Sequence, residues 1–228
     1  MFTTQDLFDL DHTQARPLLA GAVYPWEILG KIKEFILTLG PQLPREEYEE
    51  IAPHVWVARD AKVAPTAYFG EAVIIGHGTE VRHCAFVRGS ALVGAGAVVG
   101  NSTELKNVIL FDQVQVPHYN YVGDSILGFH AHMGAGSITS NIKADQKNIV
   151  IHGDGEEVAT GLRKMGAMLG DWADVGCNSV LNPGSVIGPR SRIYPLSMVR
   201  GVVPADTIYK RAGELARIRR EEDTPDAH

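Results

Sequence analysis

The 228-residue sequence predicts a parallel β-helix, an all-β fold in which short strands wind in successive coils around one core. Two observations support this prediction. Large apolar residues recur at every sixth position in two long runs, and a small or β-branched residue stands four positions after most of them. A six-residue period would scatter the apolar residues around an α-helix, whereas it suits one short strand followed by a tight turn.

The six-residue step covers most of residues 51–203, which we expect to form the β-helix. Its apolar positions are Val57, Val63, Phe69, Ile75, Val81, Val87, Val93, Val99 and Leu105 in the first run, and Leu169, Val175, Leu181, Ile187, Ile193 and Val199 in the second. In such a fold the apolar side chains point inward, and coils stack about 4.8 Å apart so that each buries the face of its neighbour.

The two ends of the chain have a different pattern. Within an N-terminal extension of residues 1–50, apolar residues at helical spacing predict a helix at about 25–39. Residues 204–222 begin with a proline and are rich in charge, which favours a second helix that caps the open end of the β-helix. We expect residues 223–228 to form a tail.

A segment at about 139–168 interrupts the six-residue step. It contains two short β-like runs around the polar turn GDGEE, which predicts a loop or hairpin that projects from the coils. Solenoid proteins place binding surface on insertions of this kind. Basic side chains favour that interpretation here, although a solvated loop would have the same composition.

Composition excludes several classes of protein. The formal net charge of −6 argues against a nucleic-acid partner, but it leaves room for a local basic pocket that binds a phosphorylated small molecule. Cys84 and Cys177 do not have the spacing of a zinc or redox motif. The acidic N-terminus lacks the apolar core of a signal peptide, and no apolar run is long enough to span a bilayer. We therefore expect a cytoplasmic protein without a membrane partner.

Four motifs carry a resemblance to a known family: VRGSALVGAGAVVGNSTELKN, VPHYNYVGDS, GAGSITSN and GLRKMGAMLGD. From Arg88 to Lys147, without a gap, the chain resembles the acetyltransferase half of the bifunctional enzyme that makes UDP-N-acetylglucosamine. It is more similar to the C-terminal half of archaeal sugar-1-phosphate nucleotidylyltransferases that also acetylate amino-sugar phosphates. The resemblance covers roughly residues 50–205. It implies a hexapeptide-repeat acetyltransferase with a left-handed β-helix, a homotrimeric assembly with active sites between subunits, and acetyl-CoA as the acyl donor.

The resemblance implies roles for four candidate catalytic residues. His118 is the general base that takes a proton from the attacking amine, a task suited to an imidazole near neutral pH. Glu104 would lie near His118 and orient the imidazole or the amine. Asn141 would bind the amine, and the backbone N–H of Ile142 would stabilise the oxyanion. Ile142 stands where the bacterial enzyme has a tyrosine.

The implied acceptor is a hexosamine 1-phosphate, of the glucosamine or galactosamine type. Arg88 and Lys106 match the family's phosphate ligands, because cations suit a sugar phosphate. Tyr121 and Lys147 stand beside them, and His132 replaces an asparagine of the bacterial enzyme.

The coenzyme would lie along the wall of the coils. The resemblance places Ala135 beside the thioester, and Cys177, Arg163 and Lys164 complete the candidate coenzyme-binding set. Three residues near His118 in the sequence are expected to have structural rather than catalytic roles. Asp124 is expected to form a tight turn, and Tyr119 and Asn120 are expected to be loop residues.

Two other functions remain open. The γ-type carbonic anhydrases share the implied fold and bind zinc through three histidines, for which His83, His118, His130 and His132 are available. The histidine pair of that family, five residues apart, is absent after His118, so we expect no metal.

The second alternative is a non-catalytic β-helix that binds a sugar nucleotide or a partner protein. The sequence contains no glycine-rich basic nucleotide loop. We therefore expect no nucleotidyl transfer by this chain, and a separate nucleotidyltransferase partner could supply that reaction.

Overall fold

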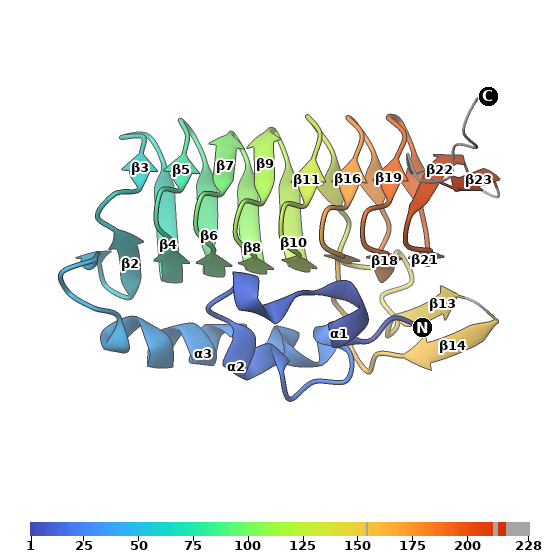
Figure 1. Ribbon diagram of the computed structural model, residues 1–228, viewed down its shortest axis with the longest axis horizontal. Helices are drawn as coiled ribbons and strands as arrows, with labels where there is room; N and C mark the ends of the chain where they lie inside the picture. The colour runs from blue at the N-terminus through green and yellow to red at the C-terminus, as the bar shows by residue number, and fades with distance from the viewer. Residues whose placement is uncertain (154, 212–213, 218–228) are drawn as a thin grey trace, which may run out of the picture.

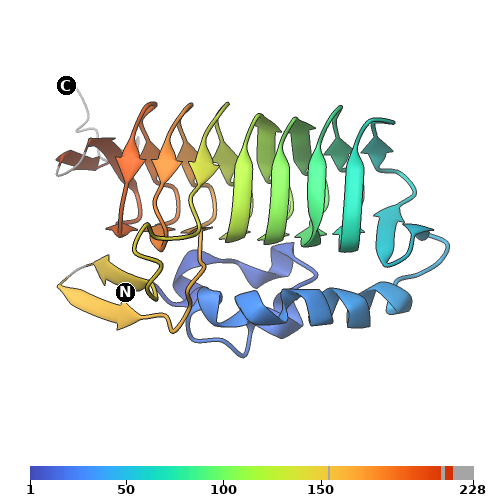
Figure 2. The same cartoon turned by 180° about the vertical axis from the view of Figure 1, so that it is seen from behind.

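The computed structural model describes residues 1–153, 155–211 and 214–217. It forms a straight stack of coils, with a helical arm along one side and a small hairpin beyond the end of that arm (Figures 1 and 2). The parallel β-helix predicted from the six-residue step is confirmed. Of the fifteen predicted apolar positions, only Val63 and Phe69, on the first coils, are not fully buried. Burial of each such side chain contributes about 1.5–3 kcal/mol.

Most strands of the described residues belong to two sheets. The larger sheet contains β1 (Tyr48–Ala52), β2 (Val55–Ala58), β4 (Tyr68–Ile75), β6 (Phe86–Val93), β8 (Glu104–Leu110), β10 (Tyr121–Leu127), β12 (Ile138–Thr139), β15 (Ala167–Leu169), β17 (Val180–Leu181), β18 (Ser185–Ile187), β20 (Met198–Val199) and β21 (Val202–Val203). The smaller sheet contains β3 (Lys62–Val63), β5 (Glu80–Val81), β7 (Val98–Asn101), β9 (Gln115–His118), β11 (His132–Met133), β16 (Asp174–Val175), β19 (Arg192–Ile193), β22 (Thr207–Arg211) and β23 (Glu214–Arg217).

The larger sheet bends, so that the coils present three faces. Strands β4, β6, β8 and β10 each cross the bend through one residue with a left-handed backbone: Ala72, Ser90, Asn107 and Asp124, with φ between 48° and 61°. After β10 the two faces are carried by separate strands, because β12 pairs with Tyr121 and β15 pairs with Ile126 and Leu127. The chain between β12 and β15 leaves the coils at this bend and forms an antiparallel hairpin, β13 (Val150–Gly153) with β14 (Glu156–Ala159).

The N-terminal arm lies along the same bend (Figure 1). Its elements are α1 (Thr4–Leu7), η1 (Leu10–His12), α2 (Arg16–Leu19), η2 (Pro25–Lys31), α3 (Ile32–Leu39) and η3 (Gly40–Gln42), where η marks a 3₁₀ helix. Helix α3 packs against β4, β6 and β8, and η2 packs against β10. The helix expected at about 25–39 is α-helical only from Ile32. Its first half is the 3₁₀ helix η2, in which Gly30 disfavours α-helix.

The predicted C-terminal helix of residues 204–222 is wrong within the described residues. Strand β22 continues the stack by pairing in parallel with β19, and β23 folds back on β22 as an antiparallel hairpin. Tyr209 is buried next to Ile193, in the same inward row. Pairing with the last coil thus overrides the local helix signals. Residues 218–222 and the expected tail at 223–228 lie outside the described residues.

Close coil stacking makes Gly100 a sensitive position. A Cβ at Gly100 would lie 1.6 Å from the carbonyl oxygen of Pro117 on the next coil. We expect Gly100→Ala to lower the free energy of unfolding by at least about 3 kcal/mol in urea denaturation, because the coils would have to move apart. Gly78→Ala is the control: its Cβ meets nothing within 4 Å, and its φ of +63° predicts a cost of only about 1 kcal/mol. Equal losses would contradict the steric explanation.

Candidate functional site

His118 ends strand β9, and its side chain is exposed. Its backbone is fixed on both sides, because its N–H donates to Asn120 Oδ1 at 3.0 Å and its carbonyl accepts from the N–H of Gly136 at 3.0 Å. The imidazole makes no hydrogen bond within residues 1–153, 155–211 and 214–217. A rigid backbone therefore presents a solvent-accessible ring, which suits a residue that exchanges a proton with a ligand.

Asn120 lies in the loop between β9 and β10, as the sequence predicted, but it is also a buried structural residue. Its side chain points inward at 2% exposure, and its Nδ2 donates to the carbonyls of Gly134 and Ser137 on the next coil, at 2.8 and 3.1 Å. It stands four positions after the buried Val116, where other coils carry small inward residues. That register was the signal that could have identified it.

Ala135 and Cys177 occupy the same position as His118 on the next two coils. The N–H of Gly136 binds the His118 carbonyl, and the N–H of Asn178 binds the Ala135 carbonyl at 2.8 Å, so these positions stack on successive coils. Cys177 is an exposed free thiol. The structure therefore brings together the proposed base and two of the four residues that the sequence assigned to the coenzyme.

Across the next corner, the face formed by β6, β8 and β10 carries the other candidates. Arg88 donates to Glu104 Oε1 at 2.9 Å, and this contact raises the pKa of the guanidinium. The Lys106 ammonium contacts both oxygens of Asp124 at 2.8 and 3.0 Å. The resemblance assigned Arg88 and Lys106 to a phosphate, and Glu104 to the imidazole of His118 or the amine. In the structure each cation is paired with a carboxylate, and Glu104 is the partner of Arg88.

Asp124 is the centre of this cluster. It is 4% exposed, and besides Lys106 it accepts hydrogen bonds from Asn107 Nδ2 at 2.9 Å and Asn141 Nδ2 at 2.6 Å. The expectation of a tight turn fits its left-handed backbone, but it missed these contacts. A buried carboxylate needs such donors to offset the loss of water. The network in turn fixes the side chain of Asn141.

Tyr121 and Asn141 meet beside Asp124. Asn141 Nδ2 lies 3.2 Å from the Tyr121 hydroxyl. Burial raises the pKa of Tyr121, and the nearby carboxylates of Asp124 and Glu104 raise it further. The phenol therefore stays protonated near neutral pH and keeps an O–H that can donate to a ligand.

Ile142 and Lys164 form an isolated antiparallel β-bridge at the base of the insertion. The neighbouring bond runs from the N–H of Met165 to the carbonyl of Asn141 at 3.0 Å. Within the described residues, the N–H of Ile142 donates no hydrogen bond, so it is available for a ligand. This backbone geometry suits the expected oxyanion donor.

Two sequence candidates stay outside the cluster. His132 lies on β11, where its Nδ1 is 2.8 Å from Asp174 Oδ1 on β16, and this contact lowers the pKa of Asp174. The exposed Lys147 contributes a backbone N–H to Asp145 Oδ1 at 3.1 Å. Among the described contacts, neither side chain touches Arg88, Lys106, Tyr121 or Asn141.

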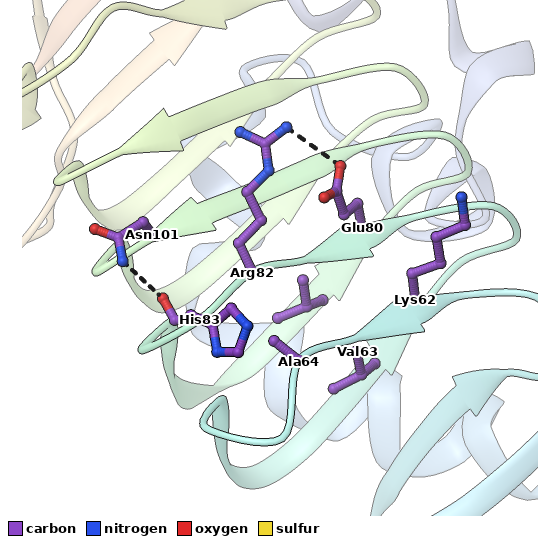
Figure 3. A pocket seen from close by; sticks show the side chains of 8 residues that line it. Lys62, Val63, Ala64, Glu80, Arg82, His83 and Asn101 are labelled. Carbon is purple, nitrogen blue, oxygen red and sulfur yellow. Dashed lines mark hydrogen bonds and ion pairs between the residues drawn. The ribbon is translucent and has the colours of Figure 1, made fainter.

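A shallow pocket on the first coils contains none of the residues assigned to acetyl transfer, although His83, a candidate for the zinc alternative, lines it (Figure 3). Arg82 donates to Glu80 at 3.2 Å, and Asn101 Nδ2 donates to the His83 carbonyl at 3.2 Å, as the dashed lines show. Asn101 pairs with His118 on the next coil. His83 is therefore an exposed histidine in the same row as His118, without its neighbours.

Among the residues that the structure describes, no group of three or more histidine, cysteine, aspartate or glutamate side chains could hold a metal ion. Likewise, none of the helices in the described part of the chain combines the length and apolar character needed to cross a membrane.

Comparison with known proteins shows relatives of the expected kind. The chain is 33% identical over 109 residues to the bifunctional sugar-1-phosphate nucleotidylyltransferase/acetyltransferase of Sulfurisphaera tokodaii, which is 48% of this chain and 27% of that protein. It is 35% identical over 112 residues to the bifunctional protein GlmU of Methanococcus maripaludis, with 49% and 27% covered. The chain is thus related to these proteins, but it spans only about a quarter of their length. No family model matches the chain.

Among solved structures, a hexapeptide transferase family protein from Anaplasma phagocytophilum has a TM-score of 0.42 with 19% sequence identity. The comparison covers 74% of this chain and 82% of that one.

Proposed function

We propose that this chain transfers an acetyl group from acetyl-CoA to the amine of a hexosamine 1-phosphate. Two lines of support meet here: the relationship to bifunctional nucleotidylyltransferase/acetyltransferases, and the side-chain cluster around Asn141. The observation that carries the proposal is the pair of polar groups at the base of the insertion, where the Asn141 side chain is next to the Ile142 N–H, which donates no hydrogen bond among the described residues. Asn141 Oδ1 can accept from an N–H of the attacking amine, and the Ile142 N–H can donate to the developing oxyanion.

In the proposed reaction, the amine nitrogen attacks the thioester carbonyl while His118 accepts the amine proton. The Ile142 N–H binds the oxyanion of the tetrahedral intermediate. Collapse of that intermediate breaks the carbon–sulfur bond, and the coenzyme leaves as a thiolate that takes up a proton. The products are the N-acetylated sugar phosphate and free coenzyme A. Ala135 and Cys177, in the same row as His118, would line the path of the coenzyme.

The active form is proposed to be a homotrimer. His118 belongs to the smaller sheet, whereas Arg88, Glu104 and Tyr121 lie on the next face, beyond a convex corner. A neighbouring copy that packs against this corner would bring residues of both faces into one site. Exposed apolar side chains favour such packing. Tyr68 and Phe86, 61% and 42% exposed, contact each other with tilted rings and pair in register with Glu104 on this face.

An assay of thiol release tests the proposal. We expect the fraction whose light-scattering mass equals three chains to release coenzyme A when it is given acetyl-CoA with glucosamine 1-phosphate or galactosamine 1-phosphate. UDP-linked amino sugars serve as comparison acceptors, and detection of the N-acetylated product excludes simple thioester hydrolysis. Absence of turnover with every amino-sugar phosphate would refute the proposed activity. Full activity in a monomeric fraction would refute the shared site.

A further inference from the structure

A cavity of about 570 Å³ lies beside Asp124, where three parts of the chain meet. The bend of the coils forms its floor, η2 of the N-terminal arm forms one wall, and the insertion forms the other. Its lining residues are Leu29, Gly30, Asn107, Asp124, Ile142, Gln146, Leu162, Arg163 and Lys164. The volume lies within the range of about 300–1,000 Å³ that is typical of small-molecule sites.

The cavity has an excess of positive charge. Asp124 is its only lining carboxylate among the described residues, and Lys106 neutralises it. Arg163 donates to the side-chain carbonyl of Gln146, which carries no charge. Neither Arg163 nor Lys164 forms an ion pair with a carboxylate in the part of the chain that the structure describes. Two cations are therefore left for an anionic ligand, and a guanidinium beside an ammonium suits a phosphate group.

The wall that the N-terminal arm provides is held in place. Asn107 Nδ2 bridges the arm and the floor, because it donates both to the Leu29 carbonyl at 3.1 Å and to Asp124 at 2.9 Å. Leu29 is buried, and Gly30 next to it is exposed. The arm, which the sequence analysis left without a role, thus completes the cavity.

The position of the cations matches the chemistry of the acceptor. Lys164 faces Ile142 across the antiparallel β-bridge, and the next residue, Met165, bonds to the Asn141 carbonyl. The Asn141 side chain contacts Asp124, which lines the cavity together with Arg163 and Lys164. In a 2-amino-2-deoxyhexose 1-phosphate, the phosphate and the amine are on adjacent carbon atoms. A phosphate bound by Arg163 and Lys164 therefore leaves the amine close to Asn141.

We propose that this cavity binds the phosphate end of the acceptor, with Arg163 and Lys164 as its anion ligands in place of Arg88 and Lys106. The inference rests on the proposed function, and it corrects the assignment of Arg163 and Lys164 to the coenzyme. Arg88 and Lys106 then have positioning roles, through Glu104 and Asp124. The N-terminal arm sets the size of acceptor that the site accepts.

Calorimetric titration tests the charge requirement without catalysis. We expect the double variant Arg163→Ala/Lys164→Ala to bind glucosamine 1-phosphate at least about tenfold more weakly than the native protein, with little change for unphosphorylated glucosamine. Lys62→Ala, which removes an exposed lysine from a distant coil, is the matched control and should bind like the native protein. In the thiol-release assay, the double variant should raise the KM for the sugar phosphate and leave the KM for acetyl-CoA unchanged.

A steric variant tests the same cavity without altering a charge. A Cβ at Gly30 or Gly21 meets nothing within 4 Å, but only Gly30 lines the cavity. We expect Gly30→Leu to weaken binding of glucosamine 1-phosphate about tenfold or more while its melting temperature stays near that of Gly21→Leu, the control.

The possible outcomes separate the two proposals. Sugar-phosphate binding that depends on the cavity, without acetyl transfer, would refute the proposed function and support the inference. Acetyl transfer that is unaffected in the charge and steric variants would support the proposed function and refute the inference. If the double variant raised only the KM for acetyl-CoA, Arg163 and Lys164 would be coenzyme ligands and the inference would be overturned. It would also be overturned if the native protein did not bind a phosphorylated hexosamine.

Discussion

His118→Ala is expected to lower kcat for acetyl transfer by about 10²–10⁴-fold, the usual contribution of a general base. The KM values should change little, because the proton is transferred only in the chemical step. The fold should be unaffected, since the ring is exposed and makes no hydrogen bond among the described residues. Initial rates of thiol release, with melting temperatures measured in parallel, check both expectations.

His83→Ala is the matched control for this experiment. His83 is an exposed histidine in the same row, two coils before His118, and it lines the pocket of Figure 3 on the first coils. It should keep native activity. Equal activity of the two variants, or a native rate in His118→Ala, would remove His118 from the proposed mechanism.

The repetitive part of the fold could be predicted because its signal is local. Each coil repeats an inward apolar position such as Val99 or Val175, so a short window of sequence already contains the pattern. The prediction of a C-terminal helix was wrong because the structure there depends on a non-local contact. The β-structure of residues 207–211 depends on pairing with β19 on the previous coil, which local charge and propensity do not reveal.

For the candidate site, the sequence named residues but not their contacts. His118, Ala135 and Cys177 lie in one row, and Tyr121 contacts Asn141, whereas the resemblance placed Tyr121 beside Arg88 and Lys106. The pairing of charges could not be derived, because partners on neighbouring coils are separated by a full turn of chain. Arg88 is 16 residues from Glu104, and Lys106 is 18 residues from Asp124.

The cavity was beyond sequence reasoning for a related reason. It requires Gly30, Asp124 and Lys164, which come from three distant segments, to lie around one space. The basic character of the insertion was visible in the sequence. The N-terminal arm closes the cavity through a hydrogen bond from Asn107 to the Leu29 carbonyl, and no sequence motif predicts that contact.

Asp124→Asn is expected to lower the free energy of unfolding by about 2–4 kcal/mol, because it leaves the half-buried Lys106 ammonium without its carboxylate. Asparagine has nearly the same shape and tolerates the left-handed backbone at this position, so the loss reports charge rather than strain. Urea denaturation provides the measurement. Asp145→Asn removes an exposed carboxylate that pairs with Lys143, and it should change stability by less than about 0.5 kcal/mol.

A double-mutant cycle with Lys106→Gln isolates the contribution of the pair. Because Lys106 and Asp124 are in direct contact, the double variant should lose less stability than the sum of the single variants, with a coupling of about 1–3 kcal/mol. Additive losses would mean that Asp124 acts through Asn107 and Asn141 rather than through charge. Activity distinguishes the same alternatives. If Asp124 mainly positions Asn141, Asp124→Asn should lower kcat even where its stability loss is small. The reason is that an asparagine side chain cannot accept from every donor that the carboxylate now binds.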